Sequence, residues 1–371
     1  MRPDPLLVFG CFVLGLFAAG QFAKISLILP VLFDLYPGAP VPFVFSGVAV
    51  MGIVLGVVAG SLVARIGPRQ AIILAVALGS VCSLAQAFLP SFWILMAWRV
   101  MEGLSHLALV IALPTLMAQA SSDAWRPIAM GLWGTFFGLG FALYGWAAPV
   151  LGSPQTILAA HGIGMAAVGL ALLPRLPKLD RGGTMPGVME AHRAIYTTPR
   201  LMVPGIGHGC YTIFFVALVT FLPDMLERPY LFSILPIAGL IGTFLAGFLA
   251  QGLGPGRVVL AGYALSGTLF TAMVVAPQDL QPLLAILAMT CSGLIPGGSF
   301  AAVPALNGSM ADRARANGGI AQLGNVGTFA GVPIMAALLP WGLGSLLAFT
   351  IVCCAVGLAS TATLYARARP T

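Results

Sequence analysis

AGSLVARIGPR, residues 59–69, joins two long apolar segments, and a related stretch, AGFLAQGLGPG, occupies residues 246–256. At an offset of 187 the two share an Ala-Gly pair, a leucine and a Gly-Pro pair in register. A second offset, of 190, places Gly103 opposite Gly293. Self-similarity over this distance is typical of a chain built from two copies of one structural unit. We therefore expect two related halves.

The composition excludes a soluble globular protein. Hydrophobic residues make up 59% of the chain and charged residues only 7%, whereas soluble domains carry roughly 25% charged residues. So few charges cannot cover a water-exposed surface, but a lipid-facing surface has to be apolar. The net charge of +7 has a better explanation in membrane orientation than in nucleic-acid binding, so we expect no nucleic-acid partner.

The apolar segments predict twelve membrane-spanning helices, because a span needs about 20 mostly apolar residues. The predicted fold is all-α, with an amino-terminal six-helix bundle over residues 1–173, a polar inter-bundle loop over 174–200 and a carboxy-terminal six-helix bundle over 201–371. The predicted spans are 6–33, 41–63, 70–89, 92–119, 127–151, 155–173, 201–222, 230–251, 257–276, 281–309, 317–339 and 342–366.

The positive charges orient the chain, since Lys and Arg concentrate in cytoplasmic loops. With the amino terminus inside, only Arg228 of the basic loop residues lies outside, while Lys24 and Arg99 fall within spans. We therefore expect both termini to be cytoplasmic, in a bacterial-type inner membrane as the short loops suggest. The predicted cytoplasmic residues are Arg2, Arg65, Arg69, Arg126, Arg175, Lys178, Arg181, Arg193, Arg200, Arg257, Arg313, Arg315, Arg367 and Arg369.

The stretch from Gly60 to Arg69 resembles the signature loop between helices two and three of the major facilitator superfamily, and Arg99 with Gly103 resembles the family's Arg-x-x-x-Gly signature in helix four. The resemblance implies a monomeric, cofactor-free, non-enzymatic carrier that moves a small molecule through the bilayer by alternating access. The family's acidic loop position is Ala64 here, so we expect a different gating latch. The residues that the resemblance assigns to gating are Gly60, Arg65, Gly67, Arg69, Gly247 and Gly254.

Ionisable side chains inside spans mark the candidate transport site, because each is costly to place in a membrane, roughly 2.5–3.5 kcal/mol on insertion scales. Arg99, Glu102 and His106 are spaced i, i+3 and i+7, so they share one face of the fourth span. Lys24 in the first span falls at a similar depth. Glu102 is the best candidate to carry a proton, with His106 as a possible relay.

The repeat makes these charges more informative. At the offset of 190 their counterparts are Met289, Ser292 and Pro296, all uncharged, so the structural template does not require charges there. Counting two cations and one carboxylate, the predicted site is net positive, which favours an anionic or zwitterionic solute. The alternative is that Arg99 and Glu102 form a purely structural pair.

Other polar residues in the spans are weaker candidates for substrate contact, since each could instead bridge helices by hydrogen bonds. These are Gln21, His208, Tyr211, Asn307, Gln322 and Asn325.

Other functional classes remain as alternatives. The glycine-rich fifth span favours a polyspecific drug or metabolite exporter that exchanges protons, and the i, i+4 spacing of Glu102 and His106, with His208, leaves a weak case for a metal-ion transporter. A non-transporting membrane sensor is also open. No phosphate-binding loop, His-Glu-x-x-His or Gly-x-Ser-x-Gly motif occurs, so the sequence predicts neither an ATPase nor an intramembrane enzyme, and no bound metal or cofactor.

Overall fold

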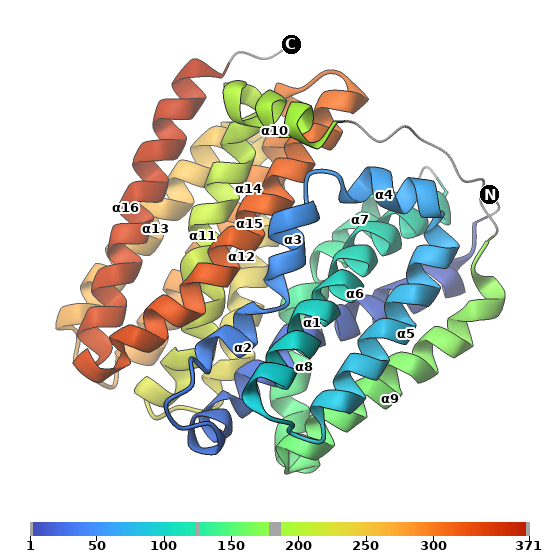
Figure 1. Ribbon diagram of the computed structural model, residues 1–371. Coiled ribbons are helices and arrows are strands. Elements are labelled where there is room, and N and C mark those ends of the chain that lie inside the picture. The colour runs from blue at the N-terminus through green and yellow to red at the C-terminus, as the bar shows by residue number, and fades with distance from the viewer. Residues whose placement is uncertain (1–2, 123–125, 178–186, 369–371) are drawn as a thin grey trace. The chain divides into compact units, whose positions relative to one another are not determined.

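The computed structural model describes residues 3–122, 126–177 and 187–368, and the regular secondary structure of this part of the chain is all helical, with no strand (Figure 1). Ten of its helices are long and apolar enough to cross a membrane, or eleven if one bent pair counts as a single span. The twelve-span count and the cytoplasmic termini stay predictions. Arg2, Lys178, Arg181 and Arg369, used above for orientation, lie outside the described residues.

The chain divides into two compact units. The first comprises Met1–Gly52 and Val58–Pro186, and the second comprises Ile53–Val57 and Gly187–Thr371. The first unit is built from α1 (Pro5–Leu35), α2 (Pro42–Ser46), α3 (Ala49–Leu55, shared with the second unit), α4 (Ala59–Ile66), α5 (Pro68–Gln86), α6 (Phe92–Gln119), α7 (Arg126–Gly134), α8 (Phe136–Leu151), α9 (Pro154–Leu172) and the 3-10 turn η1 (Leu173–Arg175). The second unit is built from α10 (Val188–Thr197), α11 (Pro199–Met225), α12 (Leu231–Leu253), α13 (Pro255–Val275), α14 (Gln281–Leu306), α15 (Met310–Leu338), η2 (Leu339–Trp341) and α16 (Leu343–Arg367).

Helix packing follows one pattern in both units. In the first unit α1 packs on α8, α5 on α6 and α5 on α9; in the second, α11 packs on α15, α13 on α14 and α13 on α16. The repeated loops also share a backbone conformation. Gly67 has φ 92° and ψ 136°, and Gly254 has φ 82° and ψ 145°. In both places the glycine ends one helix and a proline, whose φ is fixed near the helical value, starts the next.

Two predicted spans are broken rather than continuous. The segment predicted as one span over 41–63 forms α2, α3 and the start of α4, and α3 meets α4 at 91°. The segment predicted over 127–151 is divided at Thr135 into α7 and α8. Hydropathy alone does not detect such breaks, since the residues on both sides stay apolar.

Helix α10 lies in the stretch that the sequence analysis treats as a polar loop. It is amphipathic, with Ala191 and Ile195 buried, and it packs on α11 and α15. Ten residues are too few for a span, but one apolar stripe is enough to dock a short helix.

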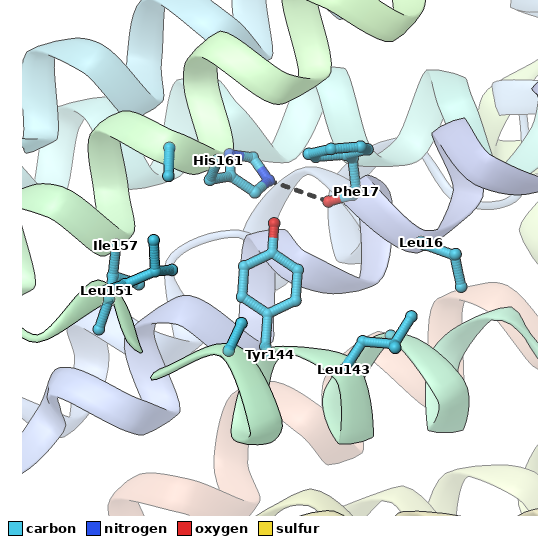
Figure 2. A pocket seen from close by; sticks show the side chains of 10 residues that line it. Leu16, Phe17, Leu143, Tyr144, Leu151, Ile157 and His161 are labelled. Atoms are coloured by element: carbon cyan, nitrogen blue, oxygen red, sulfur yellow. Dashed lines mark hydrogen bonds between the residues drawn. The ribbon is translucent and has the colours of Figure 1, made fainter. Parts of the chain in front are cut away.

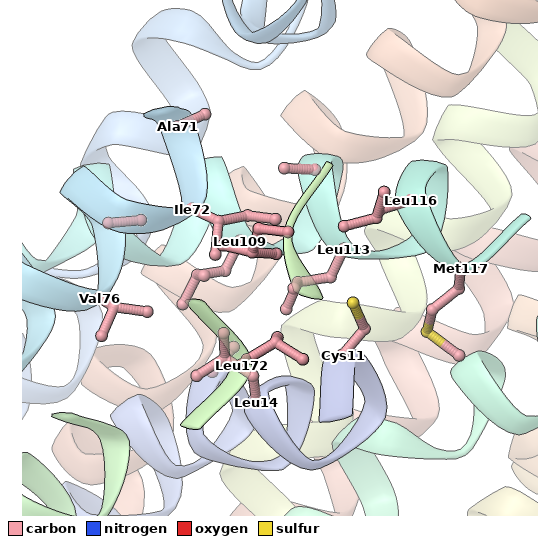
Figure 3. Packing of buried hydrophobic residues seen from close by; sticks show 14 of the residues in the cluster. Cys11, Leu14, Ala71, Ile72, Val76, Leu109, Leu113, Leu116, Met117 and Leu172 are labelled. Atoms are coloured by element: carbon pink, nitrogen blue, oxygen red, sulfur yellow. The ribbon is translucent and has the colours of Figure 1, made fainter. Parts of the chain in front are cut away.

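The interior of the first unit is a continuous apolar cluster from α1, α5, α6 and α9. Figure 3 shows Cys11 and Leu14 of α1 facing Leu109 and Leu113 of α6 across this cluster. All six cysteines are free. Against this apolar background the polar residues of the same helices form a separate group, described next.

Candidate functional site

Three ionisable side chains meet inside the first unit. Lys24 projects from α1, and its Nζ lies 2.5 Å from Oε1 of Glu102 on α6. Arg99, one turn earlier on α6, donates through Nη1 to the other carboxylate oxygen, Oε2. All three side chains have no exposed surface. We call Lys24, Arg99 and Glu102 the ion cluster.

The broken span explains how Arg99 is held. Its Nε donates to the carbonyl oxygen of Val44 at 2.8 Å, and its Nη2 donates to that of Phe45 at 3.4 Å. Both carbonyls belong to α2, which ends at Ser46. The last carbonyls of a helix have no partner within the helix and favour a cation. Arg99 therefore donates hydrogen bonds to carbonyl oxygens at the end of α2, and these carbonyls in turn stabilise the positive charge of Arg99.

Glu102 has a third donor that the sequence analysis did not identify. Gln86 on α5 donates through Nε2 to Glu102 Oε2 at 2.8 Å and has no exposed surface. The carboxylate therefore accepts three hydrogen bonds from three helices. A buried carboxylate is stable only with such partners. Gln86 was detectable as a long polar side chain inside the predicted span 70–89.

His106 and Gln21 form a second, separate group beside the ion cluster. His106 Nδ1 lies 3.1 Å from the carbonyl oxygen of Ala18 and 3.2 Å from Gln21 Oε1. Gln21 Nε2 donates to Ser105 Oγ at 3.0 Å, and that hydroxyl donates to the carbonyl of Ala75. The described contacts therefore join the predicted candidates His106 and Gln21 to each other, not to Glu102.

His161 on α9 is the histidine that connects to the ion cluster, through a serine. Its Nδ1 lies 2.9 Å from Ser83 Oγ on α5, and Lys24 Nζ donates to the same oxygen at 2.7 Å. Its Nε2 lies 3.0 Å from the carbonyl oxygen of Phe17. His161 lines an apolar pocket of about 260 Å³. Figure 2 shows the Tyr144 hydroxyl directed toward the His161 ring. The sequence analysis identified neither His161 nor Ser83 as a site residue.

In the second unit, the candidates His208 and Tyr211 lie one turn apart on α11. Their rings are 5.9 Å apart, and His208 also packs on Phe300 of α14, with ring centroids 5.4 Å apart. His208 Nδ1 is buried and has no hydrogen-bond partner among the described residues. Five other buried side-chain atoms of the described residues share this lack of a partner, among them Gln86 Oε1 beside the ion cluster.

The remaining substrate candidates are engaged in local bonds. Asn307 accepts from Arg200 Nη1 at 3.0 Å and donates to the carbonyl of Val303. Asn325 donates to the carbonyl of Ala321 in its own helix.

Gln322 holds α10 in place. Its Oε1 accepts from the Tyr196 hydroxyl at 2.7 Å, and its Nε2 donates to the carbonyl of Ile53 at 2.6 Å and lies 2.9 Å from His192 Nε2. Tyr196 and His192 are both on α10, and burial raises the pKa of the Tyr196 phenol. These bonds give Gln322 a positioning role within the second unit.

The residues assigned to gating by the loop signature differ in their surroundings. Arg69 donates to the carbonyl oxygen of Leu176, just beyond η1, and so ties the loop to the end of α9. Arg65 is exposed. Gly60 and Gly247 would accept a side chain without a neighbour within 4 Å, whereas Gly67 and Gly254 need their positive φ.

Metal binding has no support in the described residues, where no group of three or more His, Cys, Asp or Glu side chains is placed to hold an ion. The ion cluster instead has two cations for one carboxylate. Such a site repels a metal cation.

Two crystal structures of a bacterial homologue of the human lysosomal transporter Spinster resemble this fold, one inward-facing and unoccupied, the other inward-facing and occupied. Each matches with a TM-score of 0.74 at 14% identity, over 98% of this chain and 96% of the other. At this identity the likeness establishes the fold. No curated protein sequence matches.

A sequence profile described as Major Facilitator Superfamily matches residues 7–231. This segment contains the Gly60–Arg69 loop, the ion cluster and the start of the second unit. Members of that family are multi-pass membrane proteins and generally non-enzymatic carriers of small molecules. The chain belongs to the major facilitator superfamily of transporters.

Proposed function

We propose that this protein is a secondary active transporter of a small anionic or zwitterionic organic solute, coupled to protons and working by alternating access. It acts as a monomer with twelve spans in two six-helix bundles and both termini in the cytoplasm of a bacterial-type cell. The observation that carries the proposal is the ion cluster, in which Lys24 and Arg99 share one carboxylate, Glu102, with no exposed surface.

The net positive charge of the cluster supports the choice of solute. One unneutralised charge in a low-dielectric interior attracts an anion far more strongly than it would in water. The uncharged counterparts Met289 and Ser292 support a functional origin, because the second unit forms the equivalent helix without any ion pair. Ionisable residues that the fold does not need are expected to serve transport.

The carboxylate supports proton coupling. Glu102 pairs with Lys24 through Oε1 and with Arg99 through Oε2, so protonation of Glu102 would release both cations for an anionic solute. A carboxylate that alternates between cations and a proton links substrate binding to the proton gradient.

The test is a ligand screen on the purified wild-type protein and on Lys24→Met. Ligands that bind the folded state raise the melting temperature with their concentration. Small carboxylic acids and zwitterions are expected to stabilise the wild type. Lys24→Met, which leaves the Arg99–Glu102 pair balanced, is expected to fold and to lose the response to acids.

For any solute that the screen finds, transport is then measured in proteoliposomes. Accumulation against a concentration gradient when the pH differs across the membrane supports proton coupling. Stabilisation by lipophilic amines alone, or an acid response retained in Lys24→Met, contradicts the proposal.

A polyspecific exporter is the second candidate, and the pocket in Figure 2 is the observation that favours it. The pocket is lined almost wholly by apolar side chains, with Tyr144 and His161 as its polar residues. At about 260 Å³ it is smaller than the roughly 300–1,000 Å³ typical of drug-sized ligand sites. The amine arm of the same screen separates this candidate from the first.

A further inference from the structure

Three side chains from three helices form a continuous hydrogen-bonded chain that leads away from the ion cluster. Lys24 Nζ on α1 donates to Ser83 Oγ on α5 at 2.7 Å, and Ser83 Oγ lies 2.9 Å from His161 Nδ1 on α9. Lys24 and Ser83 have no exposed surface, and His161 is 1% exposed. At its far end the chain reaches the pocket of Figure 2, which His161 lines.

The tautomer of His161 follows from its neighbours. Nε2 lies 3.0 Å from the carbonyl oxygen of Phe17, and a carbonyl can only accept, so Nε2 carries the hydrogen. In the neutral ring, Nδ1 is then an acceptor. The only hydrogen available to it along this chain is the one on the Ser83 hydroxyl.

The Ser83 hydroxyl has two acceptors for one hydrogen. Besides His161 Nδ1, the carbonyl oxygen of Leu158 lies 2.8 Å from Ser83 Oγ. With neutral His161 the hydroxyl donates to Nδ1. With protonated His161, Nδ1 donates to Ser83 Oγ and the hydroxyl turns to Leu158. Both arrangements keep every donor of the chain paired, which a proton relay requires.

From this geometry we propose that Lys24, Ser83 and His161 form a proton path between the ion cluster and the pocket, with His161 as the proton-binding site at the pocket end. Lys24 Nζ gives one proton to Ser83 Oγ while the Ser83 hydroxyl gives its own to His161 Nδ1. One N–H and one O–H bond break, and one O–H and one N–H bond form. Lys24 becomes a neutral amine and His161 an imidazolium, so the total charge is unchanged.

The groups around His161 set when it holds the proton. Burial and the positive charges of Lys24 and Arg99 oppose an imidazolium at His161, and the carboxylate of Glu102 favours it. The Tyr144 ring on α8 is tilted to the His161 ring, with centroids 6.0 Å apart, and it contributes a neutral hydroxyl. An anionic solute near the cluster would act like a second carboxylate and draw a proton onto His161. The inference thus rests on the proposed function for its role in coupling, but the path itself is testable without a solute.

The first experiment measures the tautomer of His161 by nitrogen NMR on protein labelled with ¹⁵N-histidine, with His161→Gln to assign the signal. The expected result is an Nε2–H ring whose Nδ1 signal shows a hydrogen bond, and loss of that hydrogen-bond shift in Ser83→Ala. A ring that carries its hydrogen on Nδ1 at every pH from roughly 5 to 8, the range of ordinary histidine titration, overturns the path, since Nδ1 could not accept from Ser83.

The second experiment compares two modes of transport in proteoliposomes, accumulation driven by a pH gradient and counterflow without one. Ser83→Ala and His161→Gln are expected to lower gradient-driven accumulation by about a hundredfold or more, as for loss of a proton-transferring group, while counterflow stays near the wild-type rate. Ser105→Ala is the matched control, because Ser105 is an equally buried serine bonded to Gln21 and Ala75, away from the path.

Two results separate failure of the path from failure of the proposed function. Gradient-driven accumulation that survives in both Ser83→Ala and His161→Gln overturns the path while leaving a proton-coupled transporter. A wild type with no gradient-driven transport contradicts the proposed coupling, and the NMR result then decides whether the path exists as a proton site.

Discussion

The polar interiors of the two units differ in one respect that their shared fold does not predict. In the first unit the ion cluster is fully paired, and Glu102 alone accepts from Lys24, Arg99 and Gln86. In the second unit His208 is buried on α11 with Nδ1 unpaired among the described residues. Buried polar atoms without a described partner occur in both units, including Gln86 Oε1 in the first, so the difference between the units lies in the buried charge. We infer that the first unit carries the charge and the coupling, and we predict that His208 of the second unit contacts the solute.

The largest expected effect comes from breaking the ion cluster at its carboxylate. Glu102→Gln leaves Lys24 and Arg99 buried without a counter-charge, and removing one partner of a buried ion pair typically costs about 3–5 kcal/mol. We expect a marked fall in melting temperature and no transport. Lys24→Met leaves Arg99 and Glu102 balanced, so its melting temperature should stay closer to the wild type.

The decisive result is which of the two variants, Glu102→Gln or Lys24→Met, has the lower melting temperature. Thermal unfolding of both purified proteins, with flux in proteoliposomes, gives the comparison. Equal stability of Glu102→Gln and wild type would mean that the carboxylate does not neutralise two cations in the folded protein. The claim that the first unit holds a charge-paired cluster would then be wrong.

The sequence predicted the all-helical fold of the family, though not a confirmed number of spans, because its signals are repeated and strong. Long apolar segments predicted most helices to within a few residues, and the Gly-Pro pairs at residues 67 and 254 marked matching turns. It was insufficient at the breaks near residues 47 and 135, where the chain stays apolar. Hydrogen bonds between helices determine where the chain breaks, as when Arg99 donates to the carbonyl oxygens of Val44 and Phe45.

The candidate site was only partly predictable for a similar reason. Arg99 and Glu102 could be paired from their spacing on one helix, and their contact is present. Spacing cannot tell which residues on other helices approach them. It therefore favoured His106, on the same helix face, as the relay, while the described bonds lead through Ser83 to His161, 78 positions further along the chain.

An intermediate loss of stability is expected for substitutions in the glycine turns that the two units share. Gly67 and Gly254 hold a backbone conformation open almost only to glycine, and another residue there costs of order 1–3 kcal/mol. Gly67→Ala and Gly254→Ala should therefore lower the melting temperature by similar amounts. Gly60→Ala is the control, since it lies in a helix with open space for a methyl group and should stabilise slightly. A large effect at one loop and none at the other would show that the two turns are not equivalent.

The smallest expected change in stability is at His208. Substituting this residue tests whether the second unit contacts the solute through His208. Because Nδ1 has no partner to lose, His208→Phe should keep or raise the melting temperature while weakening the response to any solute that stabilises the wild type. Thr212→Val, one turn further on α11, is the control. Thr212 donates to the carbonyl of Gly209 or Gly324, each 2.9 Å away, so its loss should cost roughly 0.5–1.5 kcal/mol. If His208→Phe destabilises more than Thr212→Val, His208 is a structural residue; if it is stable and still responds fully to the solute, the solute contact lies elsewhere.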